Sequence, residues 1–540
     1  MTALLPILGL ALLAAWLAPR AGRTVAHLAA WVAHPAFAAL PGLVTALAVA
    51  AVAGGLDMPG AYHDERAYLV QARLLAGFTW AAPAPPVPSA WEMVHVFVAP
   101  ALFAKYPPGF APLLVPGVWL GAEGLGPVVL AGLAAALLFA LVRRVADPWT
   151  ALLAWALWTS APTTLRWQAT YLSETATAPL WLGALLLLHR WVTEERAWQL
   201  ATLVALVAWI GIARPVTGLA LALPIGAVLA RVAWRRRRLA GWRTACLAGG
   251  AACALVPYWT WRTTGGLREV PYVAYSRVYF PFDLPGFTRD ASPPKRPLPP
   301  DYEALADEAR RLYRDHVPAR ALANARERAI TVARASLDPR RALPLLLLVP
   351  LGALAAGAAV TGVLLASAAL QLGAYLLMPH DRAWTVYYLE LAPVLPALAA
   401  LGARQLAAWL RRAVGGDARR SLPGVASLAV ATTLVVLWRF PAECGRLAAS
   451  RRVMTARPAR LRTLVAALPD PRVVVFVRRA PAASPHFAVH DILGAPATTP
   501  TWIVRDVGPA GNAALLAAAG GRRPYVLDET TMTLRAGPPG

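Results

Sequence analysis

The sequence has little cysteine and few charged residues. Only three of its 540 residues are cysteine, and Cys246 and Cys253 are seven positions apart in one apolar run, too far for a disulfide along one helix. This excludes a disulfide-stabilised scaffold and leaves a cysteine-built metal site without support. Charged residues make up 15% against 58% hydrophobic, which excludes a soluble single-domain enzyme and a disordered chain.

Acidic residues and lysine are also scarce. There are 28 acidic against 52 basic residues, a net charge of +24, and all basic residues except Lys105 and Lys295 are arginine. Many arginines lie in short segments between apolar runs, as they do in the cytoplasmic loops of membrane proteins, where anionic headgroups attract them. The charge therefore indicates membrane topology and no nucleic-acid partner.

Long apolar runs recur along the chain, each close to the about 20 residues that a membrane-spanning helix needs. The sequence predicts an α-helical polytopic membrane protein with about twelve spans. These spans are expected at roughly 1–19, 39–56, 124–142, 149–165, 175–192, 198–213, 216–234, 242–260, 342–358, 359–379, 387–409 and 421–438.

Basic clusters between the spans predict the direction of crossing. Arg20 and Arg23 follow the first run and no basic residue precedes it, so the N-terminus is expected outside. Alternation then puts Arg235 to Arg238 in the cytoplasm. Three long segments are left outside: 57–123, 262–341 and the tail from about 440.

The chain is thus expected to have three parts. An additional N-terminal span and cytoplasmic linker occupies 1–38, the main transmembrane domain 39–439, and a small extracytoplasmic α/β domain 440–540. The α/β content of the tail rests on strands expected at 472–477, 501–505 and 524–527 and a helix at 511–519.

Helical patterns also occur in the outer segments. Residues 64–76 and 109–121 have the spacing of helices that lie along a membrane surface. Residues 301–336 have a polar helical pattern broken at Pro318. These outer segments are therefore expected to be structured.

The first outer segment contains the most informative residues. Asp64 and Glu65 follow an outward-crossing span, and Lys105-Tyr106-Pro107-Pro108-Gly109 comes about forty residues later. Two adjacent carboxylates at a membrane surface are costly unless they are paired or solvated. On spacing alone, a plain helix flank is an equal alternative to a functional site.

The ordered set of motifs resembles the GT-C superfamily of membrane glycosyltransferases. It is most similar to the bacterial branch related to protein O-mannosyltransferases and aminoarabinose transferases, which is glycosyltransferase family 39-like. The likeness covers nearly the whole chain beyond residue 38. Besides the two motifs above, it includes Ser173-Glu174, Ala213-Arg214-Pro215, Pro257-Tyr258-Trp259, Pro271-Tyr272, Tyr275, His380-Asp381-Arg382 and Tyr387-Tyr388-Leu389-Glu390.

The resemblance implies an inverting transfer of a sugar from a polyprenyl-phosphate donor to an envelope glycan, lipid or protein acceptor. The reaction would take place at the outer face of the bacterial cytoplasmic membrane. Asp64 would be the catalytic base with Glu65 as its neighbour, Lys105 would contact the donor phosphate, and Arg382 is a weaker candidate for the same contact. Such a base is chemically sensible, and a nearby second carboxylate would raise its proton affinity.

Further substrate-binding residues follow from the same resemblance: Tyr106, Glu174, Tyr388 and His95. In some relatives an acid at the place of Glu174 binds a divalent metal ion and in others transfer needs none, so a metal at Glu174 stays open and no cofactor is certain. Four other histidines are expected to be solvated or hydrogen-bonded side chains and not ligands: His63, His380, His486 and His490.

A transporter or flippase for a lipid-linked envelope precursor is the alternative function, because about twelve spans also suit a transporter. It would place ionisable residues in mid-span along a path, and the apolar runs contain few. A non-catalytic scaffold built around the tail would leave the acidic pair and the lysine motif without a purpose.

Overall fold

The computed structural model describes most of the chain. The described ranges are 22–236, 241–287, 292–314, 316–337, 342–413, 415, 422–479 and 490–539. The expected span 1–19, Arg237, Arg238 and His486 lie outside the described residues.

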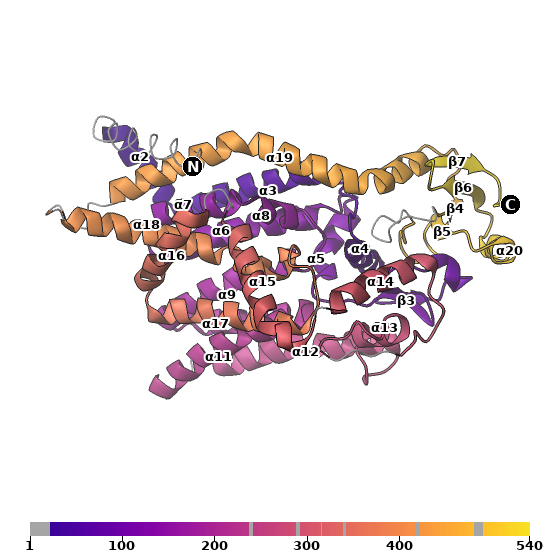
Figure 1. The fold of residues 1–540 in the computed structure, drawn as a ribbon, viewed down its shortest axis with the longest axis horizontal. Helices are drawn as coiled ribbons and strands as arrows, with labels where there is room; N and C mark the ends of the chain where they lie inside the picture. The colour runs from indigo at the N-terminus through magenta and orange to yellow at the C-terminus, as the bar shows by residue number, and fades with distance from the viewer. Residues whose placement is uncertain are drawn as a thin grey trace.

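Helices form a bundle that makes up most of the molecule (Figure 1). These helices are α2 (Gly22–Ala33), α3 (Ala39–Ala53), α6 (Leu125–Val145), α7 (Pro148–Thr159), α8 (Pro162–Gln168), α9 (Glu174–Glu194), α10 (Ala197–Ala213), α11 (Pro215–Arg236), α12 (Trp242–Thr264), α16 (Ala342–Ala356), α17 (Ala358–Ala374), α18 (Val394–Ala413) and α19 (Leu422–Ala466).

The helical multi-pass architecture agrees with the prediction. Within the described ranges, five helices are long and apolar enough to cross a membrane, or six if Thr385–Leu391 and Val394–Ala413, which meet at 42°, form one broken span. The expected number of about twelve spans is not confirmed.

Three expected spans differ in detail. The run 149–165 is two helices, α7 and α8, because Ala161 is extended (φ −80°, ψ 114°) and Pro162 begins a new helix after it, as the residue before a proline favours an extended conformation. The run 387–409 opens as the 3₁₀ segment η5 (Thr385–Leu391). The last run does not stop near 438, since α19 continues as one helix to Ala466. The first part of the segment 440–540 is therefore helix α19, and the α/β fold begins later.

Most of the outer segments gather at one end of the bundle, together with the tail, and the helix at 321–336 lies nearer the middle of the bundle (Figure 1). They contain α4 (His63–Ala76), α5 (Ala111–Trp119), α13 (Pro271–Tyr279), α14 (Pro300–Arg314), α15 (Ala321–Ser336) and a three-stranded antiparallel sheet in the order β1 (Ala82–Pro83), β3 (Ala101–Ala104), β2 (Val96–Phe97). Short 3₁₀ turns join them at η2 (Pro88–Trp91) and η3 (Pro318–Arg320), and others lie in the bundle at η1 (Pro35–Ala38) and η4 (Tyr375–Leu377).

Helix α4 differs from the expected surface helix, because it is buried on almost every side. Glu65, Arg66 and Gln71 are as buried as Leu69 and Val70. Its charged side chains are tolerated inside because other segments bring opposite charges to them. The apolar spacing correctly predicted a helix, but it could not show which segments cover its polar face.

The tail forms a small α/β fold close to the expected one. Strands β4 (Val473–Arg478), β5 (Thr501–Arg505) and β6 (Arg523–Asp528) are parallel in the order β5-β4-β6, with α20 (Pro509–Ala518) between β5 and β6 in sequence. A fourth strand, β7 (Thr533–Ala536), pairs antiparallel with β6 and was not predicted. The continuous Val473–Val477 run is buried, as is usual in a parallel sheet.

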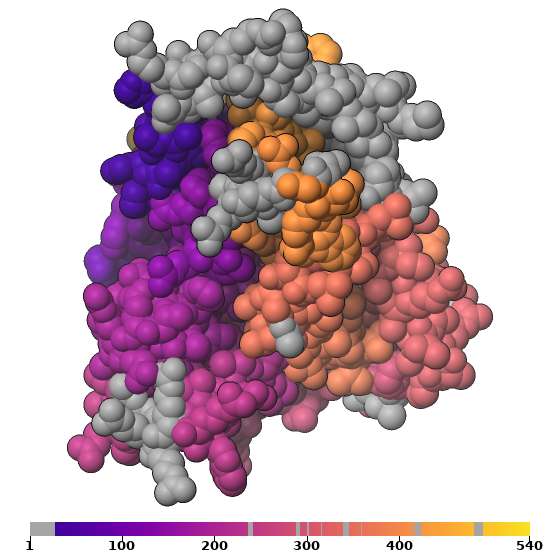
Figure 2. Space-filling model, turned by 90° about the vertical axis from the view of Figure 1, so that its left-hand side faces the viewer, coloured from indigo at the N-terminus to yellow at the C-terminus, as the bar shows by residue number. Residues whose placement is uncertain are grey.

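The opposite end of the bundle carries helix ends. Figure 2 shows this end, where atoms of the first half of the chain, coloured indigo to magenta, lie beside orange atoms of the later part. Most of the expected outer segments lie at the other end of the molecule, with the tail (Figure 1).

Candidate active site

The first turn of α4 carries the acidic pair, and it turns the two carboxylates in different directions. Glu65 is fully buried, and its Oε1 accepts the backbone N–H groups of Ala61 and Tyr62, each at 3.3 Å. Its Oε2 accepts the Tyr171 N–H at 3.1 Å and Arg451 Nη2 at 3.1 Å. Glu65 thus caps the helix and ties it to α19, and it does not face the Asp64 carboxylate.

Asp64 faces a group of polar side chains from the first outer segment. The Tyr106 hydroxyl donates a hydrogen bond to its Oδ1. His63 Nδ1 lies 3.0 Å from Asp64 Oδ2, and His95 Nε2 lies 3.6 Å from Oδ1. The side chain of Asp64 keeps 22% of its surface exposed, so it is accessible from the cavity described below.

These neighbours determine the charge of Asp64. Burial alone would raise its pKa, but the charges of His63 and His95 and hydrogen bonds from His63 and Tyr106 hold the pKa well below its usual range. The carboxylate is therefore ionised at neutral pH. The expectation that a second carboxylate would raise its proton affinity is wrong, because Glu65 points elsewhere and histidines take its place.

Lys105 and Tyr106 follow β3 directly, and the sheet aims them toward Asp64. The Lys105 N–H donates to the His95 carbonyl at 2.9 Å, which continues the pairing of β3 with β2. The Tyr106 ring stacks on Tyr68 of α4, with ring centroids 4.4 Å apart. The motif therefore brings a lysine and a tyrosine to the acidic helix, as the resemblance implied.

Gly109 ends this motif at a place where no side chain fits. A Cβ on Gly109 would lie 2.5 to 2.8 Å from backbone and side-chain atoms of Ala213, and Trp209 donates its indole N–H to the Gly109 carbonyl at 2.8 Å. Glycine is thus required for the close approach of the motif to the end of α10.

The Lys105 ammonium is buried, with 2% of its side chain exposed, and it lies among aromatic rings. It is 4.4 Å from the Tyr272 ring centroid and 5.1 Å from that of Tyr275. The Asp283 Oδ2 lies 4.0 Å from Nζ. Burial lowers the pKa of Lys105, partly offset by Asp283 and Asp64, and burial raises the pKa of Asp283 more than Lys105 lowers it.

A cavity of about 250 Å³ joins these groups. The first outer segment supplies His63, Asp64, His95, Lys105 and Tyr106. The second outer segment and the loop before α18 supply the rest, including Tyr272, Phe280, Phe282, Asp283, Glu308, His380, Asp381, Trp384 and Tyr387. Four of the residues predicted from the sequence, namely Asp64, His95, Lys105 and Tyr106, therefore line one space.

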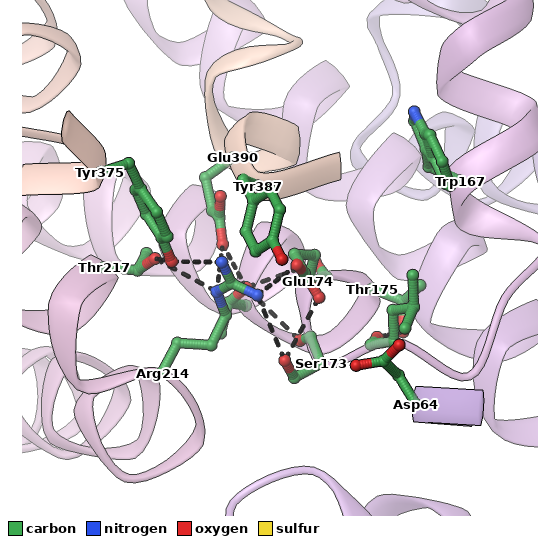
Figure 3. A network of polar contacts seen from close by, with 12 residues as sticks. Asp64, Trp167, Ser173, Glu174, Thr175, Arg214, Thr217, Tyr375, Tyr387 and Glu390 are labelled. Atoms are coloured by element: carbon green, nitrogen blue, oxygen red, sulfur yellow. Dashed lines mark hydrogen bonds and ion pairs between the residues drawn. The ribbon is translucent and has the colours of Figure 1, made fainter. Parts of the chain in front are cut away.

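Glu174 belongs to a different group of charges. It forms an ion pair with Arg214, which also lies 4.0 Å from Glu390 and contacts Tyr375 (Figure 3). Glu390 accepts a hydrogen bond from Gln371 at 2.8 Å. In Figure 3 Asp64 lies apart from this network. An ion at Glu174 would have to displace the Arg214 guanidinium, so the residues there do not suit a divalent metal.

Besides Glu65 and Glu174, two further predicted residues, Arg382 and Tyr388, lie outside the cavity. Arg382 is largely exposed and pairs with Glu327 at 3.3 Å. Tyr388 is buried and its hydroxyl contacts His380 Nε2 at 3.2 Å, while its neighbour Tyr387 lines the cavity. Tyr388 has a non-helical conformation (φ −125°, ψ 24°) inside η5. This local backbone conformation explains why Tyr387, and not Tyr388, lines the cavity.

Three of the four histidines that were not expected to be ligands lie in the described ranges, and they are of two kinds. His380 Nδ1 lies 2.9 Å from the Met378 carbonyl, and burial, with the charge of Arg328, lowers its pKa to about 3. His490 Nε2 lies 2.7 Å from the Glu92 carbonyl. Both are hydrogen-bonded, as expected. His63 differs, because it offers a ligand atom within 4.8 Å of those of Asp64 and His95.

The sequence analysis did not identify Asp283, and it expected His63 to be only a solvated or hydrogen-bonded side chain. Asp283 stands in a proline-rich stretch with no periodic pattern to mark it. His63 directly precedes Asp64, which was a signal that could have been used. Tyr387 could have been found with Tyr388, since both belong to the same motif.

No family model and no curated relative matches the chain. Some solved structures are similar to the chain. ArnT from Cupriavidus metallidurans bound to undecaprenyl phosphate matches at a TM-score of 0.45 and 13% identity, over 82% of this chain and 83% of that chain. Arabinosyltransferase EmbB from Mycobacterium smegmatis matches at 0.37 and 15%, over 78% and 41%.

The archaeal oligosaccharyltransferase AglB from Archaeoglobus fulgidus, in complex with an inhibitory peptide and a dolichol-phosphate, matches at a TM-score of 0.35 and 12% identity, over 81% of this chain and 62% of that chain. Similarities at this level assign neither a substrate nor a residue role.

Proposed function

We propose that the chain is an inverting glycosyltransferase that moves a sugar from a polyprenyl-phosphate-linked donor to an acceptor at the outer face of the bacterial cytoplasmic membrane. One observation carries the proposal: the ionised Asp64 and the buried Lys105 ammonium line the same cavity. Transfer from a glycosyl phosphate needs a proton acceptor for the attacking hydroxyl and positive charge where the leaving phosphate develops negative charge.

In this proposal Asp64 accepts the proton of the acceptor hydroxyl as that oxygen attacks the anomeric carbon. Its depressed pKa keeps the carboxylate in the accepting form at neutral pH but also makes it a weak base. In the structure, the Tyr106 hydroxyl donates a hydrogen bond to Asp64 Oδ1. An acceptor hydroxyl that displaces the Tyr106 hydroxyl would donate its own hydrogen bond to Asp64, and its proton passes to the carboxylate along this bond.

Lys105 is suited to the donor phosphate. The Asp283 carboxylate oxygen lies 4.0 Å from the Lys105 Nζ, which is longer than a charge-assisted hydrogen bond. A phosphate oxygen at hydrogen-bond distance would be a closer partner for a desolvated ammonium, which acts as a compact point charge.

The other residues that line the cavity suit a sugar and the first part of a lipid chain. Phe280, Phe282, Trp384 and Tyr387 present aromatic surface to the cavity, and binding sites for organic ligands are mostly apolar with a few placed polar groups. The Tyr387 ring also lies 5.6 Å from the Arg214 guanidinium. The Arg214 network thus supports one side of the wall without entering it.

The test is transfer by purified protein in liposomes supplied with radiolabelled polyprenyl-phosphate sugars. We expect labelled product on an extracted envelope acceptor fraction. Label that crosses the bilayer with no product formed would favour the transporter or flippase alternative and would overturn the proposal.

The acceptor can be found by comparing a deletion strain with its parent. Mass spectrometry of envelope glycans, lipid A and glycoproteins should reveal one class that lacks a sugar in the deletion strain. Restoration by the wild-type chain, and not by an Asp64→Asn variant, would link that class to this cavity.

A further inference from the structure

We propose that the small α/β fold of the tail holds the residues of the cavity in place, and that Arg505 is the positioning residue through which it acts. Arg505 Nε donates a hydrogen bond to the Glu92 carbonyl at 2.7 Å. His490 Nε2 lies 2.7 Å from the same carbonyl. Two side chains of the tail thus hold one backbone atom of the first outer segment. The effect on sugar transfer rests on the proposed function, whereas the contacts themselves do not.

The Glu92 carbonyl lies close in sequence to two residues of the cavity. His95 follows Glu92 by three residues, and the His95 carbonyl accepts the Lys105 N–H at 2.9 Å. The side chains of His95 and Lys105 line the cavity together with Asp64. A shift of the backbone at Glu92 would therefore move both side chains relative to Asp64.

The segment from Glu92 to Lys105 has little regular structure to hold it. Strands β1 to β3 have only two to four residues each, which is short for strands of globular proteins. His95 has φ of +69°, which is uncommon for a residue other than glycine, and such a conformation persists where surrounding contacts fix it. The position of this segment therefore depends on contacts from other parts of the chain, and two of these come from the tail.

The side chain of Glu92 is held by the second outer segment. It is 2% exposed and forms an ion pair with Arg296, and its Oε2 accepts a hydrogen bond from the Tyr279 hydroxyl at 3.3 Å. Glu92 is thus fixed from two sides, by its carboxylate and by its carbonyl. Because the carboxylate contacts remain without Arg505, loss of the arginine is expected to loosen this segment and not to unfold it.

The same stretch of the tail also contacts helix α4, which carries Asp64. Asp491 and Ile492 directly follow His490. Arg73 of α4, with 7% of its side chain exposed, donates to Asp491 Oδ1 at 3.1 Å and to the Ile492 carbonyl at 2.9 Å. Consecutive tail residues therefore contact both elements that supply charged groups to the cavity.

These contacts involve the edge of the tail sheet where such folds usually bind ligands. Open α/β sheets bind ligands at the carboxyl ends of their parallel strands. Arg505 is the last residue of β5, and Trp502 of the same strand packs against Trp91 of η2 with ring centroids 5.2 Å apart. The first outer segment thus covers the carboxyl end of β5, which favours a positioning role over a separate ligand site at this place.

Loss of the hydrogen bond from Arg505 should impair the chemical step. Arg505 is 7% exposed, so its charge-assisted hydrogen bond to the Glu92 carbonyl is shielded from water and stronger than a neutral one. Misplacement of a reacting group by about 1 Å can cost about a hundredfold in rate. Arg505→Met keeps part of the aliphatic chain but has no donor, and we expect its turnover to be at least about tenfold below that of wild type.

The test compares wild type, Arg505→Met and Arg505→Lys as purified full-length protein in liposomes. Transfer from a radiolabelled donor gives the turnover, and hydrogen exchange followed by mass spectrometry reports the protection of each backbone segment. In Arg505→Met we expect faster exchange over residues 92–105 and unchanged exchange over β4 and β6. Arg505→Lys should recover part of the rate, because an ammonium can donate to the same carbonyl. Arg523→Gln, which removes an exposed tail arginine paired with Asp470, should match wild type in both measurements.

Exchange over residues 92–105 equal to that of wild type, or a wild-type turnover in Arg505→Met, would overturn the proposal. If Arg505→Met loses protection throughout the tail, His490→Leu takes its place, because it removes the other contact to the Glu92 carbonyl and should give the same local change. Wild-type protein that transfers no sugar would overturn the proposed function, while exchange over residues 92–105 would still decide whether the tail holds this segment.

Discussion

Glu65 is expected to act in folding and not in chemistry, and Glu65→Gln tests this directly. The glutamate is fully buried and satisfies the N–H groups of Ala61, Tyr62 and Tyr171 as well as Arg451. Removing one partner of a buried ion pair costs about 3 to 5 kcal/mol. Glutamine keeps one acceptor oxygen for the helix cap but turns an amide donor toward other donors, so the loss should fall in this range.

The assay is equilibrium or thermal unfolding of purified protein in detergent. Glu65→Gln should lower the unfolding midpoint clearly, and Arg451→Met added to it should recover part of the loss, because the unpaired buried cation is gone. Directly interacting pairs show coupling energies of about 0.5 to 3 kcal/mol.

A matched control is Glu443→Gln, which breaks an ion pair with Arg446 at the surface and should cost less than about 1 kcal/mol. An unchanged unfolding midpoint for Glu65→Gln, together with lost sugar transfer, would refute the reasoning and give Glu65 a part in the reaction.

Three other predictions follow from the site and the topology. Burial lowers the pKa of Lys105, so its charge and donor binding should be lost at a lower alkaline pH than for a free lysine. Lys105→Arg should remove this alkaline loss in a pH profile of transfer while retaining part of the rate, and Lys105→Ala should depress binding and turnover at every pH. Gly109→Ala should lower stability by about 1 to 3 kcal/mol through overpacking against Ala213, whereas Gly211→Ala, which lies inside α10 and meets no atom within 4 Å, should be at least as stable as wild type because alanine favours a helix interior. Alkaline phosphatase fused after residue 445 should be active and after residue 237 inactive; the reverse pattern would overturn the topology.

Local patterns in the sequence predicted most helices and the tail strands well. The buried Val473–Val477 run became β4, and the break at Pro318 separates α14 from α15. The long α19 was cut short in the prediction because a hydropathy pattern ends where a helix leaves the apolar layer, although the backbone hydrogen bonds continue. The strands β1 to β3 are too short for a periodic signal.

The site was predicted in part, and the missing part depends on tertiary contacts. Motif order placed Asp64, Lys105 and Tyr106 together, and the structure brings them into one cavity. Nothing in the sequence could show that Arg451, far along the chain, would bind Glu65 or that Arg214 would bind Glu174. These ion pairs decide which carboxylate remains available for proton transfer. They form between segments far apart in the sequence, so they can be identified only in the folded structure.

The central claim is that Asp64 is the base of a sugar transfer, and the rate of transfer by purified Asp64→Asn protein tests it most directly. Asparagine keeps the shape of the side chain but lacks a carboxylate, and general-base assistance is worth about 10²- to 10⁴-fold in rate. The account predicts at least about a hundredfold loss with donor binding and folding retained, while Asp307→Asn, at an exposed carboxylate of α14, transfers at the wild-type rate. Transfer by Asp64→Asn at a rate near wild type would contradict the account.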